Sequence, residues 1–383
     1  MYLIYRWVIR VLYTIFKRSP VKTRVVFLSR QSGKPSLDFT LLESALRVEL
    51  PGWEFATSCY RDAGSLAARI GGTLKQLRLV AGSRICVVDG YTPAVSIPRL
   101  DPSTVVVQIW HALGTFKRFG WQALDGEAGR TEAQAKQLMM HRQYSLVIAG
   151  GEGPRAAFAQ AFDCPESRII PLGMPRMDYL LDDGPQCERK RIKAAVIDQY
   201  PQLANGRVNV LFVPTLRKGN GRANAKRHLE ELASHLPAEM FNLIVAFHPL
   251  SVHHAEKESV TPLAPIIPIS PIRGIDLLEL ADYVVTDYSA IAFEAALLRR
   301  KVVFYVPDIV AYRVSPGLNI DPEEQFSTIS FRDAAPLAQF IQCDIQEDRY
   351  TVSGFWQYCD TYLAQPAQGA TARIARCISE AVA

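Results

Sequence analysis

Residues 281–308, ADYVVTDYSAIAFEAALLRRKVVFYVPD, constrain the fold of this chain most, because they predict a strand, a polar turn, a helix and a second strand without a gap. Asp287 and Ser289 are favourable helix N-caps that directly follow the first strand. A helix that begins after a parallel strand points its unpaired N–H groups outward, where an anion is stabilised. The segment therefore predicts a phosphate site, in which Asp287 fixes the turn or holds a ribose. An ordinary βαβ unit with a capped helix is the structural alternative.

The rest of the chain repeats this alternation of short apolar runs and helical patterns, which is typical of parallel α/β layers. The runs that predict strands are residues 25–28, 85–88, 105–109, 146–149, 209–213, 242–246, 283–286 and 302–305. A length of 383 residues and a hydrophobic content of 49% fit two domains with two buried cores. We expect Rossmann-like doubly wound domains at residues 23–195 and 196–383, with a cleft between them and ligands beyond the carboxyl ends of the strands.

The first 22 residues form a separate segment that is aromatic, apolar and basic. Six basic residues and no acidic ones precede position 25, leaving 37 of the 43 basic residues against all 38 acidic ones. The apolar run is too short and too charged for a spanning helix, which needs about 20 residues, and it has no signal-peptide cleavage site. We therefore expect a peripheral helix at an anionic membrane surface. A helix docked on the protein's own core or on a partner chain is the alternative.

Polar residues follow several of the predicted strands. His111 comes directly after the third strand and is followed by Gly114, Thr115 and Lys117. Histidine titrates near neutrality and can accept a proton from an attacking hydroxyl, while glycine and lysine suit the approach of a phosphate. His111 is therefore the candidate general base, although a lone histidine is often structural.

In the second half of the chain, Thr215 and Arg217 follow one strand and His248 follows the next. A guanidinium offers a planar fork of donors to phosphate oxygens, so these residues predict contacts with a phosphorylated donor. His253 and His254 lack Cys, Asp or Glu at ligand spacing, and no metal is expected. No cofactor is predicted.

Several other classes of protein are excluded by missing motifs. The seven cysteines have no CxxC spacing and resemble reduced cytosolic residues. There is no GxxxxGK[ST] and no GxGxxG after the first strand, so neither a P-loop NTPase nor a dehydrogenase is expected. The basic charge is confined to the N-terminus, and nucleic acid is not an expected partner.

Five segments taken together resemble the CDP-glycerol glycerophosphotransferase family of bacterial teichoic acid synthesis. They are WHALGTFKRFG, GMPRMDYL, VPTLRKG, FHP and the stretch from residue 276 to residue 312. The resemblance implies a GT-B fold and transfer of glycerol phosphate from CDP-glycerol to a hydroxyl of a lipid-linked acceptor, with release of CMP. It implies an undecaprenyl-diphosphate saccharide as acceptor and the cytoplasmic face of the plasma membrane as location.

The resemblance also assigns roles to residues. His111 matches the histidine thought to act as base, His248 the second essential histidine and Ser289 the serine at the donor pyrophosphate. The predicted donor-binding set is Thr215, Arg217, Asp287, Ser289, Ala290 and Glu294. The weaker candidates for acceptor or phosphate binding are Gly114, Thr115, Lys117 and Arg176.

Two departures from the family pattern leave alternatives open. The glycine and threonine after His111 are displaced by two residues, and Ala290 replaces the second serine of the usual DYSS. The alternatives are a CDP-ribitol or nucleotide-sugar transferase for a capsule polymer and a non-catalytic membrane-associated scaffold that binds nucleotide or polyanion. Polymerases of the family tend to carry extra N-terminal regions, which favours one or few transfers here.

Overall fold

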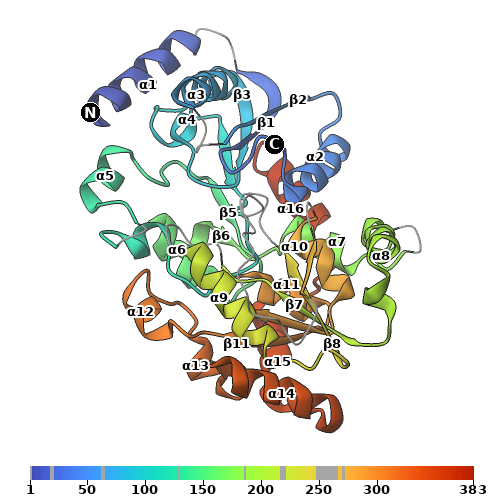
Figure 1. The fold of residues 1–383 in the computed structure, drawn as a ribbon. Helices are drawn as coiled ribbons and strands as arrows, with labels where there is room; N and C mark the ends of the chain where they lie inside the picture. The colour runs from blue at the N-terminus through green and yellow to red at the C-terminus, as the bar shows by residue number, and fades with distance from the viewer. Residues whose placement is uncertain are drawn as a thin grey trace. The chain divides into compact units, whose positions relative to one another are not determined.

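The chain forms two compact units, which the computed structural model describes at residues 2–17, 21–61, 65–126, 129–184, 187–215, 221–246, 266–269 and 272–383 (Figure 1). The first unit comprises Met1–Gly114, Arg118–Asp178 and Thr361–Ala383, and the second comprises Thr115–Lys117 and Tyr179–Asp360. The boundary therefore falls before the predicted 195/196.

Two features explain this difference in boundary. Helix α8 (Glu188–Gln199) belongs to the second unit because its Arg189 is buried and binds Glu279 and the carbonyl oxygen of Tyr179. Helix α16 (Ala370–Glu380) returns to the first unit and lies beside α2 (Leu37–Glu49) (Figure 1). Its Ile374 and Ile378 are buried in the same core as residues of α2.

The sheet of the first unit is parallel, with strand order β2-β1-β3-β4-β5-β6. Its strands are β1 (Lys22–Ser29), β2 (Glu54–Cys59), β3 (Ser83–Val88), β4 (Val105–Gln108), β5 (Leu146–Ile148) and β6 (Ile169–Ile170). The chain moves from β1 outward to β2 and then returns to β3 on the other side of β1. The switch point of this sheet, where ligands bind in open α/β folds, therefore lies between the ends of β1 and β3.

Helices cover both faces of this sheet. One core contains residues of α1 (Tyr2–Phe16), α3 (Leu66–Val80), α4 (Pro93–Ser96) and α6 (Arg155–Phe162), and the other contains residues of α2 and α16. The remaining helices are α5 (Glu132–Gln137) and α7 (Pro175–Leu181). Both inner strand faces are apolar, as expected for a parallel sheet between helical layers.

The second unit repeats this architecture with the order β12-β11-β10-β7-β8-β9, again parallel. Its strands are β7 (Val208–Phe212), β8 (Phe241–Ala246), β9 (Ile266–Ile269), β10 (Tyr283–Thr286), β11 (Lys301–Tyr305) and β12 (Ser330–Phe331). Its other helices are α9 (Gly221–Ala233), α10 (Gly274–Leu277), α11 (Ile291–Leu297), α12 (Ile309–Val314), α13 (Pro322–Gln325), α14 (Ala334–Glu347) and α15 (Phe355–Tyr362). The switch point lies between β7 and β10.

The eight predicted strands are confirmed, and the four strands that the sequence did not predict are all edge strands. They are β2, β6, β9 and β12, which lie at the ends of the two sheet orders. An edge strand has one neighbour and can be short, polar or interrupted by proline. Strands β6 and β12 have two residues each, and β9 contains Pro268, so their apolar signal in the sequence is weak.

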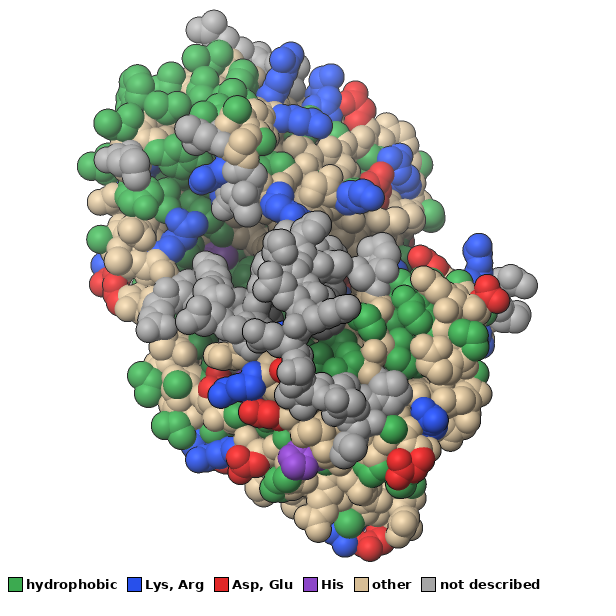
Figure 2. Space-filling view, in the orientation of Figure 1, with side chains coloured by type: hydrophobic (Ala, Val, Ile, Leu, Met, Phe, Trp, Pro, Cys, Tyr) green, Lys and Arg blue, Asp and Glu red, His purple; other side chains and the backbone are tan. Residues whose placement is uncertain are grey.

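Helix α1 docks on the first unit through one face. Ile9 and Tyr13 are buried in the core, and the hydroxyl of Tyr13 accepts a hydrogen bond of 3.2 Å from the backbone N–H of Asp101. The other face is exposed and carries Leu3, Ile4 and Trp7. Figure 2 shows hydrophobic side chains gathered at the end of the molecule where Figure 1 labels α1. Within the described residues, no helix is long and apolar enough to cross a membrane.

Candidate functional site

At the switch point of the second unit, Asp287 ties the ends of β7 and β10 together. Its Oδ1 accepts hydrogen bonds from the Thr215 backbone N–H at 2.8 Å and the Thr215 hydroxyl at 2.6 Å. It also accepts a bond of 2.6 Å from the backbone N–H of Tyr288. The Asp287 side chain is buried and these bonds hold the turn, while its other predicted role, holding a ribose, stays a prediction.

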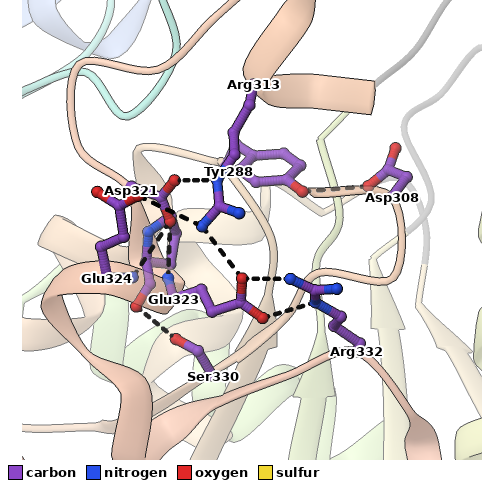
Figure 3. Close-up of polar contacts among 9 residues, drawn as sticks. Tyr288, Asp308, Arg313, Asp321, Glu323, Glu324, Ser330 and Arg332 are labelled. Carbon is purple, nitrogen blue, oxygen red and sulfur yellow. Dashed lines mark hydrogen bonds and ion pairs between the residues drawn. The ribbon is translucent and has the colours of Figure 1, made fainter. Parts of the chain in front are cut away.

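Tyr288 braces the same turn from the other side. Its ring is buried and stacks on Tyr312 with 3.8 Å between centroids and 14° between planes, and its hydroxyl donates to Asp308 at 3.2 Å. Next to Tyr312, Arg313 donates to Asp321 at 2.6 Å and to Glu323 at 3.1 Å (Figure 3). This network attaches α12 and α13 to the turn, and the sequence did not predict it.

Ser289 is half-buried and lies where the turn enters α11. Its Oγ is 3.5 Å from the backbone N–H of Ile291, which leaves the hydroxyl hydrogen able to donate to a ligand. Ala290 is the N-cap residue and offers no side-chain cap. Helix α11 has only seven residues, so its dipole is small, and an anion here would depend chiefly on Ser289. Glu294 is buried inside the unit.

Arg217 and His248, the other two predicted donor contacts, lie outside the described residues. Their roles stay predictions.

In the first unit, His111 follows β4 and has an exposed side chain. Its Nδ1 is 2.9 Å from the carbonyl oxygen of Asp89. A carbonyl oxygen can only accept, so Nδ1 carries the proton and the neutral ring has its lone pair on Nε2. This is the tautomer that a general base needs, because Nε2 can take a proton while Nδ1 stays held.

Trp110 precedes His111 and has a strained backbone conformation. Its φ is 53°, an uncommon value for a bulky residue, and its N–H donates to the side chain of Gln108 at 2.8 Å. The indole contacts the imidazole of His111 with centroids 4.0 Å apart, stacks on Phe119 at 4.6 Å and meets Phe162 edge-on at 5.3 Å. Nothing in the sequence indicated this backbone conformation.

Asp89 is a further polar residue at this edge, directly after β3. It is buried, and its Oδ1 has no hydrogen-bond partner within the described residues. Burial raises the pKa of its carboxyl to about 7, although a hydrogen bond from Ser29 opposes this shift. Asp89 also follows a predicted strand, so the position that indicated His111 could have indicated Asp89 as well.

The weaker predicted residues are engaged inside the protein. The hydroxyl of Thr115 donates to the carbonyl oxygen of Lys117, which also accepts a bond of 3.2 Å from Asn319. Arg176 forms an ion pair with the buried Asp38 at 2.5 Å. Gly114 is buried at the end of the first unit's segment. These contacts account for the residues structurally and leave their predicted ligand contacts untested.

The described residues contain no group of three or more His, Cys, Asp or Glu that could hold a metal ion.

The two parallel, doubly wound sheets define an α/β protein of the GT-B class, which confirms the predicted fold class. The wall teichoic acid polymerase TagF has a similar fold, with a TM-score of 0.72 and 16% identity over 98% of this chain and 92% of that chain. A family model described as CDP-glycerol:poly(glycerophosphate) glycerophosphotransferase matches residues 11–380. The chain belongs to this family, and the predicted resemblance is confirmed.

Curated relatives of the chain are named as enzymes of teichoic acid synthesis. A teichoic acid ribitol-phosphate primase of Bacillus spizizenii is 28% identical over 309 residues, covering 78% of this chain and 76% of that protein. A teichoic acid glycerol-phosphate primase of Bacillus subtilis is 26% identical over 247 residues, covering 64% of this chain and 61% of that protein. Both polyols therefore occur among the names of its relatives.

Proposed function

We propose that this protein transfers glycerol phosphate from CDP-glycerol to a hydroxyl group of a lipid-linked teichoic acid acceptor and releases CMP. The observation that carries the proposal is the family match over residues 11–380. The names of the relatives support a role in wall teichoic acid synthesis.

His111 is the proposed general base. Nε2 takes the proton of the acceptor hydroxyl while that oxygen attacks the phosphorus that bears the glycerol, and the bond from this phosphorus to the oxygen of CMP breaks. The hydrogen bond from Nδ1 to Asp89 strengthens as the ring becomes positive, because the donor is then charged.

On the donor side, Ser289 is proposed to donate its hydroxyl to a phosphate oxygen of CDP-glycerol. Asp287 and Thr215 hold the turn in place for this contact. Arg217 and His248 remain candidates for contacts with the transferring phosphoryl group, on the strength of their motifs.

The test is release of CMP from CDP-glycerol with a lipid-linked acceptor. His111→Ala is expected to lower kcat by about a hundredfold or more, the usual contribution of a general base, with donor binding retained. Ser289→Ala is expected to weaken donor binding instead. A His111→Ala variant with full turnover would contradict the assignment of the base, and nucleotide binding by the wild type without turnover on any acceptor would favour a scaffold.

CDP-ribitol is the second candidate donor, since the ribitol-phosphate primase matches 78% of this chain against 64% for the glycerol-phosphate primase. Turnover of CDP-glycerol and CDP-ribitol at matched concentrations separates the two. A higher kcat/KM with CDP-ribitol would replace glycerol by ribitol in the proposal.

We also propose that α1 holds the protein at the membrane surface as a peripheral element. Its exposed face carries Leu3, Ile4 and Trp7, which are 63%, 69% and 66% exposed, and Arg6 lies among them. Aromatic and aliphatic side chains beside arginine suit the interface of an anionic bilayer. Because the opposite face is anchored by Ile9 and Tyr13, this helix would orient the whole first unit on the bilayer.

Sedimentation with vesicles tests the membrane proposal. Trp7→Ser should reduce binding to vesicles that contain anionic lipid, whereas Val48→Ser, which removes an even more exposed apolar side chain from α2, should not. Equal binding by wild type and Trp7→Ser would contradict the assignment of α1.

A further inference from the structure

A cluster of two basic residues and one aromatic residue, Arg30, Arg130 and Tyr91, lies at the switch point of the first sheet and has no role in the proposed function. Strands β1 and β3 are neighbours there, and Arg30 follows the end of β1 while Tyr91 lies just beyond the end of β3. Open α/β sheets bind their ligands in the crevice at such a point. The cluster therefore occupies the place where this unit is expected to hold a ligand.

Two guanidinium groups share the ring of Tyr91. The Cζ of Arg130 is 5.1 Å from the ring centroid and the Cζ of Arg30 is 5.8 Å from it. Arg30 is also 5.9 Å from the ring of Tyr60 and donates to the carbonyl oxygen of Tyr91 at 3.2 Å. The hydroxyl of Tyr91 donates to the carbonyl oxygen of Leu138 at 2.7 Å, which fixes the ring between its neighbours.

Arg130 has no carboxylate partner in the described part of the chain. Arg130 is half-buried, and its guanidinium contacts the ring of Tyr91. A partly desolvated arginine is usually paired with a carboxylate or a phosphate. This unneutralised charge points to an anionic ligand.

Among the described residues, two acidic groups at this edge do not neutralise Arg130. Asp38 is paired with Arg176. Asp89 is buried, which raises the pKa of its carboxyl to about 7, so a large share of it is protonated at neutral pH. The charge of Arg130 therefore has no carboxylate partner among the described residues of this edge.

The cluster also lies near the apolar helix α1. Burial is the main cause that raises the pKa of the Tyr91 hydroxyl; Arg130 opposes it, and Tyr5 of α1 adds to it through its electrostatic interaction. On the other side, the carbonyl oxygen of Asp89, two residues before Tyr91, holds His111. A ligand with three parts fits this arrangement. Its lipid tail would lie at α1, its phosphorylated head at the arginine cluster and its reactive hydroxyl at the imidazole of His111.

We propose that Arg30, Tyr91 and Arg130 form a binding site for a phosphoryl anion, a diphosphate or phosphate diester, that belongs to the acceptor. The proposal rests on the proposed function for the identity of the acceptor. The forked donors of two arginines match phosphate oxygens, and the ring of Tyr91 holds the guanidinium groups in place when no anion is bound. The site would hold the acceptor while its hydroxyl reaches His111.

Binding without turnover tests this site in the full-length protein. The probe is a polyprenyl diphosphate in neutral phosphatidylcholine vesicles, and binding of CDP-glycerol is measured in parallel by calorimetry. Arg130→Gln is expected to weaken binding of the diphosphate lipid by about tenfold, in the range of a charge-assisted hydrogen bond, and Arg130→Lys by less. Arg142→Gln, at an exposed position of the same unit, is the matched control and should bind like the wild type.

Competition by inorganic pyrophosphate shows whether the protein recognises the diphosphate group or the lipid chain of the probe. Displacement of the lipid by pyrophosphate in the wild type, with weaker displacement in Arg130→Gln, supports recognition of the phosphoryl group itself. Failure of pyrophosphate to compete would overturn the proposal, as would wild-type affinity of Arg130→Gln for the lipid. An equal loss of CDP-glycerol binding would also overturn it, because the cluster would then serve the donor. These measurements need no catalysis, so they remain decisive if the transfer activity fails.

Discussion

Replacing Asp287 tests whether this residue fixes the turn or holds a ribose. Its Oδ1 accepts three hydrogen bonds, two of them from the backbone N–H groups of Thr215 and Tyr288. Leaving a buried N–H group without a partner costs about 1–3 kcal/mol each, so Asp287→Ala should lower the free energy of unfolding by about 3–5 kcal/mol. Asp287→Asn keeps an oxygen at the same place and loses only the charge, so about 1–2 kcal/mol is expected.

The assay follows the second unit by itself. Of the five tryptophans, only Trp356 belongs to this unit, where its Nε1 donates to the carbonyl oxygen of Arg300 at 3.1 Å. Protein labelled with 5-fluorotryptophan therefore gives one fluorine resonance that reports unfolding of the second unit in guanidinium chloride. Asp198→Ala, at an exposed position of α8, is the control and should change stability by less than about 0.5 kcal/mol.

The result also separates the two predicted roles of Asp287. If it fixes the turn, Asp287→Asn should bind CDP-glycerol nearly as well as the wild type. An unchanged unfolding midpoint in Asp287→Ala, together with lost nucleotide binding, would refute the reasoning and assign the carboxylate to the ligand.

Two buried titrating groups and one glycine give further predictions. Burial lowers the pKa of His141 to about 3, so below about pH 6 the unfolded chain binds a proton at this residue that the folded protein does not bind. The free energy of unfolding should therefore fall by up to about 1.4 kcal/mol per pH unit between about pH 6 and pH 4. His141→Gln should remove this slope in denaturant titrations. The pH dependence of stability has the opposite sign for Asp89, because its pKa is raised to about 7 in the folded state. The stability that Asp89 contributes is therefore present below about pH 4 and lost as the pH rises through 7. Asp89→Asn should therefore raise the unfolding midpoint at pH 8 and leave it nearly unchanged at pH 4, and a lower midpoint at pH 8 would contradict this. A Cβ on Gly150 would lie 2.0 Å from the carbonyl oxygen of Leu113. Gly150→Ala should therefore lower the free energy of unfolding by about 1–3 kcal/mol and slow CMP release by moving the loop after His111. An unchanged Tm in calorimetry would contradict this prediction.

The inner strands and the polar residues that follow them could be predicted from the sequence. A strand with neighbours on both sides in a parallel sheet is buried on both faces, so β4 and β10 appear as short apolar runs. Because ligands gather at the carboxyl ends of such strands, His111, Thr215 and Ser289 were found without knowing the fold in detail.

The edge strands and the roles of single polar atoms could not be predicted in this way. Edge strands carry weak apolar signals, and the return of α16 to the first unit depends on packing between residues more than 300 positions apart. Whether Asp287 binds a neighbouring N–H group or a ligand depends on which strand lies beside β10, which is a property of the strand order.

By itself, the sequence determined an α/β chain with two parallel sheets, membership of a glycerophosphotransferase family and the strand ends where polar chemistry collects. These features depend on the local order of apolar and polar residues along each strand and helix. Only the tertiary structure decided that Asp287 accepts hydrogen bonds from Thr215 and Tyr288, that the carbonyl oxygen of Asp89 holds His111 in the tautomer of a base, and that Arg30 and Arg130 both contact the ring of Tyr91. The physical reason is that a hydrogen bond or cation–π contact depends on distances between side chains from different strands, which the order of residues along the chain does not specify.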